Sequence, residues 1–346
     1  VIAYLDIPDG RSEYYGSRAT ERLSKMANDE ASKAAAKERF EAIVASLPLD
    51  PDSNRKRLQS LIRLVEDPKQ DEAFLDPLRK AYSTLPSYRK VPEFKLVNAG
   101  RSEMRKKVGT APSDHHRALA DELIFLGLYD EAAPEYDISI PTTSAGPSDV
   151  AFTKAVLYKR GDKGFKAVAF AEPLWRSVPA DYQIELIPRQ MIELLYPAPY
   201  AGAFRKHAKP RDIDPRFLLS LVRQESRYQP DVKSYAAARG LMQFISTTSN
   251  KIASELNRPN FEQDELYDAP TAVLFGSQYT ANLFKLFPKQ PEAVAASYNG
   301  GEDNVARWLG RTNQTDEGVF AAEVGFSESK NYVFKVMNNY RVYRDL

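Results

Sequence analysis

The residue whose type and position best suit it to catalysis is Glu225. Leu218, Leu221, Val222 and Glu225 follow one another at spacings of three, one and three, so they share one face of a helix. Burial of that face disfavours a charged carboxylate, and the negative end of the helix dipole acts in the same direction. Both effects predict a raised pKa and a protonated Glu225 near neutrality, the state that a general acid for glycoside cleavage needs. Spacing alone also allows a solvated glutamate at the margin of the apolar stripe.

Three motifs further along the chain favour the catalytic interpretation. Residues 240–243 read Gly-Leu-Met-Gln and open another helical pattern. Residues 297–301 read Ser-Tyr-Asn-Gly-Gly, which ends a helix with two glycines, as a loop close to a ligand requires. Residues 332–333 read Tyr-Val. Each motif alone has a structural interpretation, because Met242 could fill the core, Tyr298 could be a buried aromatic, and the two glycines could form a plain turn.

In this order and spacing, the motifs resemble those of the soluble lytic transglycosylases of bacterial cell-wall metabolism. These enzymes belong to glycoside hydrolase family 23 and are related to goose-type lysozyme. The motif-bearing part covers about residues 196–346, and a weaker likeness extends to residues 14–23 and 126–132. The resemblance implies an all-α protein, with a solenoid-like superhelix of helical hairpins followed by a lysozyme-like, mainly α catalytic domain.

The resemblance also implies a role for each site residue. Glu225 would be the catalytic acid, and Tyr332 would hold its carboxyl group in place. Ser226 and Gln243 would form hydrogen bonds near the sugar or the acid, and Met242 would provide an apolar wall. The Tyr-Asn pair at 298–299 would line the cleft and orient an N-acetyl group. The complete substrate-binding set is Ser226, Gly240, Met242, Gln243, Tyr298, Asn299 and Tyr332.

The chain departs from the family pattern at three places. The family's Gly-Ala-x-Gly run before Leu-Met-Gln is here Ala-Ala-Ala-Arg-Gly at residues 236–240, and its Ala-Tyr-Asn-Ala-Gly run is Ser-Tyr-Asn-Gly-Gly. Where the family shows Glu-x-Ile-Pro-Phe, aligning Phe326 puts Ala322 at the Glu position and Gly325 at the Pro position. The roles of Glu323 and Glu328 are therefore open, and the departure affects peptide or distal-sugar contacts rather than the acid.

No second carboxylate in these motifs has a claim comparable to that of Glu225. Asp231 follows a proline as a turn residue, and Glu302 and Asp303 flank the Gly-Gly loop as solvated residues. One carboxylate suffices where the substrate supplies its own nucleophile: the C6 hydroxyl of N-acetylmuramic acid can attack its own C1 and displace the β-1,4-linked N-acetylglucosamine, giving a 1,6-anhydro sugar. Two alternatives stay open, namely hydrolysis by water, as in goose-type lysozyme, and a non-catalytic helical scaffold that binds the cell wall.

Composition excludes several other chemistries. The chain has 346 residues, with 48 Lys and Arg against 47 Asp and Glu, and this balance argues against nucleic-acid binding. It has no cysteine, three histidines and no nucleotide, flavin or metal signature, so no cofactor is expected. No apolar run of about 18 residues predicts a membrane span. The expected partners are peptidoglycan glycan strands in the periplasm or cell envelope, and the start at Val1 is expected of a chain whose export signal has been removed.

Helices are the elements that must position Glu225. Apolar residues repeat with helical period over residues 19–47, 58–65 and 118–132. Helical hairpins bury their apolar faces by stacking, and such a stack could also recruit cell-wall proteins. Pro197 and Pro199 give a stiff crossing, so we expect a helical domain at 1–198, divided near residue 110, and a catalytic domain at 199–346. Asp214 and Pro215 predict the start of the helix that carries Glu225.

Overall fold

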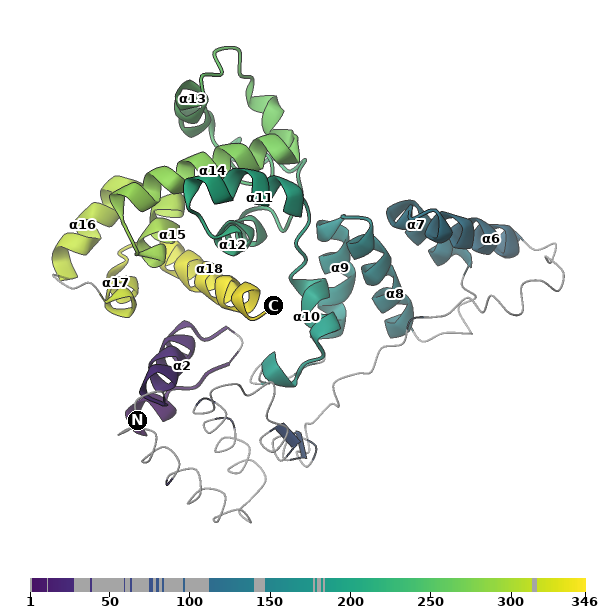
Figure 1. Ribbon diagram of the computed structural model, residues 1–346, viewed down its shortest axis with the longest axis horizontal. Helices are drawn as coiled ribbons and strands as arrows, with labels where there is room; N and C mark the ends of the chain where they lie inside the picture. Colours follow the sequence, from purple (N-terminus) through teal and green to yellow (C-terminus); the bar gives the residue numbers. More distant parts are fainter. Residues whose placement is uncertain are drawn as a thin grey trace. The chain divides into compact units, whose positions relative to one another are not determined.

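The computed structural model describes residues 2–10, 12–27, 112–139, 147–176, 184–312 and 316–346, together with isolated positions between them. Every regular element in these ranges is a helix, and the only other pairings are two isolated bridges, Lys233 with Arg239 and Arg239 with Phe244. The predicted all-α class is therefore confirmed (Figure 1). Three predictions lie mostly or wholly outside the described residues: the helix at 58–65 apart from Gln59 and Arg63, the part of 19–47 beyond Ala27 apart from Glu38, and the division near 110.

The chain forms two compact units, which are described one at a time. The first consists of Val1–Pro92, Ser177–Pro188 and Arg307–Asn338, and the second consists of Glu93–Arg176, Arg189–Ala306 and Asn339–Leu346. The predicted domain division at residue 198 stays a prediction.

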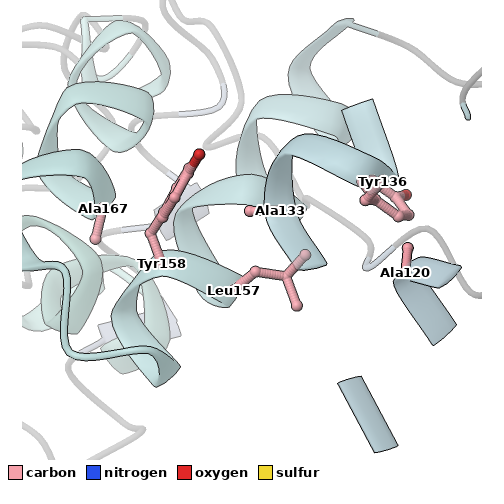
Figure 2. Close-up of a cluster of buried hydrophobic side chains, with 6 residues drawn as sticks. All are labelled: Ala120, Ala133, Tyr136, Leu157, Tyr158 and Ala167. Atoms are coloured by element: carbon pink, nitrogen blue, oxygen red, sulfur yellow. The ribbon is translucent and has the colours of Figure 1, made fainter. Parts of the chain in front are cut away.

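The second unit begins with helical hairpins that pack one on the next. Contacts join α6 (Pro112–Phe125) to α7 (Tyr129–Ser139), α7 to α8 (Pro147–Arg160), α8 to α9 (Gly164–Trp175) and α9 to α10 (Arg189–Leu195). Figure 2 shows the buried cluster of the first four helices, which comprises Ala120, Ala133, Tyr136, Leu157, Tyr158 and Ala167. The alanines let neighbouring helices approach closely, and the tyrosines fill the space between them. The hairpin predicted at 118–132 is confirmed.

The remainder of the second unit is arranged around one long helix. This helix, α14 (Ala269–Leu286), contacts α11 (Ala201–Ala208), α12 (Pro215–Glu225), α13 (Ser246–Glu255) and α15 (Pro291–Gly300) (Figure 1). Its buried residues are mostly small, such as Ala272, Gly276 and Ala281, so its neighbours can pack close to its backbone. Two short 3-10 helices, η2 (Lys209–Arg211) and η3 (Gln263–Tyr267), join these elements. Of these helices, α11 and α14 contact α12, whose last residue is Glu225.

The first unit combines the N-terminal part of the chain with two segments from later in the sequence. It contains α1 (Ile2–Leu5), α2 (Tyr14–Ala27), η1 (Ile184–Leu186) and α17 (Glu317–Glu323), together with parts of α16 (Glu302–Thr312) and α18 (Ser327–Asp345). The Tyr14 ring of α2 stacks on the Phe334 ring of α18, with 4.8 Å between centroids. An ion pair between Arg22 and Asp316 adds a second contact. In the part of the chain that the structure describes, no helix has the length and hydropathy needed to cross a bilayer.

Candidate active site

Glu225 is the last residue of α12, and local sequence signals fix where that helix begins. The Asp214 carboxylate accepts a hydrogen bond from the Arg216 backbone N–H at 2.9 Å, and Pro215 occupies the first turn. Both features match the predicted helix start. Leu218, Leu221 and Val222 are fully buried, as the apolar stripe predicts, and Glu225 itself is partly buried. The apolar stripe thus anchors the helix and leaves its terminal carboxylate at the border between the core and solvent.

The chain turns sharply immediately after Glu225. The backbone N–H of Ser226 donates to the Val222 carbonyl oxygen at 3.0 Å, and its buried hydroxyl donates to the same oxygen at 3.3 Å. Arg227 and Tyr228 then adopt left-handed conformations with φ of 52° and 68°. Ser226 thus closes the end of α12, and its predicted hydrogen bond to a sugar or to the acid stays a prediction.

The loop before α13 requires its glycine and is held together by its glutamine. Gly240 has φ of +73°, and a Cβ atom there would lie 1.9 Å from the Leu266 carbonyl oxygen, so no other residue fits. The Gln243 side chain donates to the carbonyl oxygens of Gly240, at 2.8 Å, and Val232, at 3.3 Å. The backbone N–H of Gly240 also donates to Val232, at 3.0 Å. Gln243 therefore braces the loop, and its predicted contact with substrate stays a prediction.

Met242 and Tyr298, which come from separate motifs, meet beside Glu225. The Tyr298 hydroxyl donates to the Met242 carbonyl oxygen at 2.8 Å. Burial, followed by the negative charge of Glu225, raises the pKa of Tyr298 well above its ordinary value, so the phenol keeps its proton. The Met242 side chain is fully buried against Gly276 of α14. Three motifs that are far apart in the sequence are therefore brought together at one place.

An aromatic cluster extends this site, and no sequence motif predicted it. The rings of Phe244, Tyr279 and Tyr298 have centroid separations of 5.3–6.0 Å. Burial, and then Glu302, raises the pKa of Tyr279, whose hydroxyl lies 3.5 Å from a carboxylate oxygen of Glu302. Lys251 approaches the other oxygen of Glu302 at 3.8 Å. Glu302 begins α16, and its side chain, which is 36% exposed, keeps contact with solvent as predicted while it also faces Tyr279.

The remaining predicted residues lie as follows. Asn299 is exposed near the end of α15, and Gly301 ends that helix with φ of +83°, as the double glycine predicts. Tyr332 belongs to the first unit, where it is buried in α18, and its contact with Glu225 stays a prediction. Glu323 and Glu328, in that same unit, are exposed. Among the described residues, no group of three or more His, Asp or Glu side chains could hold a metal ion.

The part of the chain around Glu225 matches a known protein family. Residues 202–320 match the family described as the transglycosylase SLT domain. This range contains Glu225 and the Gly-Leu-Met-Gln and Ser-Tyr-Asn motifs. This match agrees with the resemblance found in the sequence, and it covers the SLT transglycosylase domain at residues 202–320.

Several characterised proteins are similar to the chain. The soluble lytic murein transglycosylases of Escherichia coli K12 and Salmonella typhimurium are 28% identical to it over 155 residues, which is 44% of this chain and 24% of each relative. The membrane-bound lytic murein transglycosylase C of Sodalis glossinidius is 25% identical over 184 residues, which is 46% of this chain and 50% of the relative. The chain thus spans about a quarter of the length of the soluble relatives that it matches in sequence.

Two solved structures share the fold over nearly the whole chain. The 70 kDa soluble lytic transglycosylase of E. coli has a TM-score of 0.54 and 17% identity, covering 99% of this chain and 65% of that one. The lytic transglycosylase Slt of Pseudomonas aeruginosa, solved as an inactive mutant, has a TM-score of 0.50 and 17% identity, covering 97% and 55%. The similarity includes the helical hairpins as well as the SLT domain.

Proposed function

We propose that the protein is a lytic transglycosylase that cleaves the β-1,4 bond between N-acetylmuramic acid and N-acetylglucosamine in peptidoglycan. The observation that supports this most directly is the meeting of three motifs: Glu225 lies beside a Tyr298 hydroxyl that is fixed on the Met242 carbonyl oxygen. The relatives that are similar to the chain are named as murein transglycosylases, which supports the same substrate. The protein would then act in the cell envelope, where that substrate lies.

The proposed mechanism uses Glu225 twice. As an acid, it protonates the glycosidic oxygen, so that the bond to C1 of N-acetylmuramic acid breaks and N-acetylglucosamine leaves. The N-acetyl group at C2 stabilises the cationic C1. As a carboxylate, Glu225 then takes the proton from the C6 hydroxyl while the C6 oxygen bonds to C1, which closes the 1,6-anhydro ring and restores the protonated acid. Intramolecular attack has an effective molarity on the order of 10⁵ M or more, so no activated water is required.

Tyr298 restricts what else the site can do. Its hydroxyl is a neutral donor committed to the Met242 carbonyl oxygen, and its raised pKa excludes it as a base near neutral pH. In this proposal Glu225, rather than Tyr298, therefore carries both proton transfers. General acid–base catalysis of this kind contributes about 10²–10⁴-fold to a rate.

Glu225→Gln is the direct test, because it keeps the size of the side chain and replaces the ionisable carboxyl group with an amide that cannot act as an acid. We expect solubilisation of purified sacculi to fall by at least about 10²-fold. The inactive P. aeruginosa structure carries a glutamine in place of a glutamate, which is a precedent for this variant in the fold. Glu122→Gln, on the exposed surface of α6, is the matched control and should retain full activity.

Mass spectrometry of the released products separates transglycosylation from hydrolysis. A 1,6-anhydro product is one water lighter than the product that a lysozyme-type hydrolase releases. If Glu225→Gln solubilises sacculi at the wild-type rate, the assignment of the acid is overturned. Wall binding without any turnover by the wild-type protein would favour a non-catalytic scaffold.

A further inference from the structure

Arg223, two residues before Glu225, is fixed to the segment that leads from the hairpins to α11. Its guanidinium donates to the Leu195 carbonyl oxygen and lies over the Tyr196 ring, 4.0 Å from the centroid. A guanidinium held between a carbonyl oxygen and an aromatic face is a well-oriented contact that lysine cannot reproduce. The crossing that the sequence predicted to be merely stiff is thus attached to the helix that carries Glu225.

A chain of hydroxyl groups attaches the residues that follow Glu225 to the same segment of the chain. The Tyr343 hydroxyl donates to the Pro197 carbonyl oxygen at 2.8 Å, so in its hydrogen bond with the Tyr228 hydroxyl it must act as acceptor. Tyr228 in turn accepts from the Arg223 guanidinium. The hydrogen bonds therefore all run in one direction. Arg223 donates to Tyr228, Tyr228 donates to Tyr343, and Tyr343 donates to the Pro197 carbonyl oxygen.

An ion pair makes the third attachment. Arg227, two residues after Glu225, pairs with Glu172 of α9. Arg227 and Tyr228 both have left-handed backbones, which an arginine or a tyrosine does not adopt without external support. The contacts of Arg223, Arg227 and Tyr228, which we call the arginine clamp, supply that support.

We propose that the arginine clamp positions the carboxylate of Glu225, so that α9 and residues 195–197 act as part of the catalytic machinery rather than as a passive support. The proposal rests on the proposed function. Arg223 and Arg227 are positioning residues in this scheme, because they act through the backbone on either side of Glu225. Their loss should lower the rate of the chemical step and leave substrate affinity nearly unchanged.

Charge reversal of the Arg227–Glu172 pair tests the clamp at an accessible site. In the full chain, Arg227→Glu should lower kcat on purified glycan strands by about tenfold while KM stays within about twofold. The double variant Arg227→Glu, Glu172→Arg should recover kcat to within about twofold of the wild type. Lys163→Glu is the matched control, because the Lys163–Asp130 pair has nearly the same exposure, 52% and 31% against 49% and 30%. This control should leave kcat unchanged.

Arg223 provides a second, independent variant. Misplacement of a catalytic group by about 1 Å costs about 10²-fold, so Arg223→Met should lower kcat by that factor, and Arg223→Lys should recover only part of it. If Arg223→Met does not fold, the charge-reversal variants of Arg227 and Glu172 decide whether the arginine clamp positions Glu225. Unchanged kcat in Arg227→Glu, or no recovery in the double variant, would overturn the proposal.

Hydrogen exchange separates failure of the clamp from failure of the proposed function. The backbone N–H groups of Ser226 and Gln229 are hydrogen-bonded in the turn after Glu225. They should exchange faster in Arg227→Glu than in the wild type, and the double variant should restore their protection, whatever the protein catalyses. An inactive protein with this exchange pattern would refute the proposed function, and an active protein with unchanged exchange and kcat would refute the clamp.

Discussion

Replacement of Gly240 by alanine should disable the loop that carries Met242 and Gln243. The new methyl group would lie 1.9 Å from the Leu266 carbonyl oxygen, where real Cβ atoms keep at least 3.0 Å. The left-handed backbone, with φ of +73°, costs an alanine about 1–2 kcal/mol. Forcing the extra atom into packed backbone adds about 1–3 kcal/mol. We therefore expect Gly240→Ala to lower the free energy of unfolding by about 2–5 kcal/mol.

Alanine variants of two other glycines separate the contributions of backbone strain and of the contact with Leu266 to this loss of unfolding free energy. Gly301 has φ of +83° but open space around the Cβ position, so Gly301→Ala should lose only the backbone contribution of about 1–2 kcal/mol. Gly202 lies in α11 with an ordinary backbone and open space, so Gly202→Ala should stabilise the protein by about 0.5–1 kcal/mol. Urea unfolding of the three full-length variants measures all three free energies on one scale.

Activity gives the second readout of the same change. The loop or Leu266 must move by about 1 Å to admit the methyl group, and the loop supplies the carbonyl oxygen that holds Tyr298. A shift of that size costs about 10²-fold in kcat. Gly202→Ala should keep wild-type kcat. If Gly240→Ala proves no less stable than Gly301→Ala, the contact with Leu266 does not constrain the loop and the reasoning fails.

Two further predictions concern single side chains. Tyr298→Phe removes the hydroxyl that donates to Met242, so unfolding in urea should show a loss of about 0.5–1.5 kcal/mol, with a lower kcat; unchanged stability would contradict the role of this bond. Burial favours the neutral form of Asp214, but hydrogen bonds from Arg216 and Tyr340 outweigh it and lower the pKa of Asp214. Its stabilisation should therefore be complete above the unfolded-state pKa of about 3.9 and be lost as pH falls through the lower folded-state value. Asp214→Asn, which keeps a capping side chain, should flatten this acid limb when the free energy of unfolding is measured against pH, and an unchanged limb would refute it.

The sequence predicted α12 well because its signals are local. Asp214 and Pro215 act on the first turn of the helix, and the spacing of Leu218, Leu221 and Val222 determines which face is buried. These effects need only a few neighbouring residues, so they can be predicted before any tertiary contact is known. The same holds for the end of α15, where Gly301 supplies the positive φ that terminates the helix.

The aromatic cluster could not be predicted in this way. Tyr279 lies in α14 and Phe244 in the loop before α13, and neither belongs to a recognisable motif. Their contact with Tyr298 depends on how α14 packs against α15 and on the bridge between Arg239 and Phe244. Glu302 shows the same limit, since its partners Tyr279 and Lys251 come from two other helices.

The distribution of backbone strain links these observations. In the part of the chain that the structure describes, nine non-glycine residues have positive φ, and four of them, Arg227, Tyr228, Ala237 and Gln243, lie within 20 residues after Glu225. Each such residue costs about 1–3 kcal/mol unless its surroundings impose the conformation. Here the surroundings are the Glu172 ion pair, the hydroxyl chain through Tyr343 and the hydrogen bonds inside the loop. Because these contacts impose the positive φ values, loosening any of them lets the turn relax toward ordinary backbone. Their partners lie far from Glu225 in the sequence. The position of the carboxylate then becomes a property of the hairpins and of the end of α18 as much as of α12 itself.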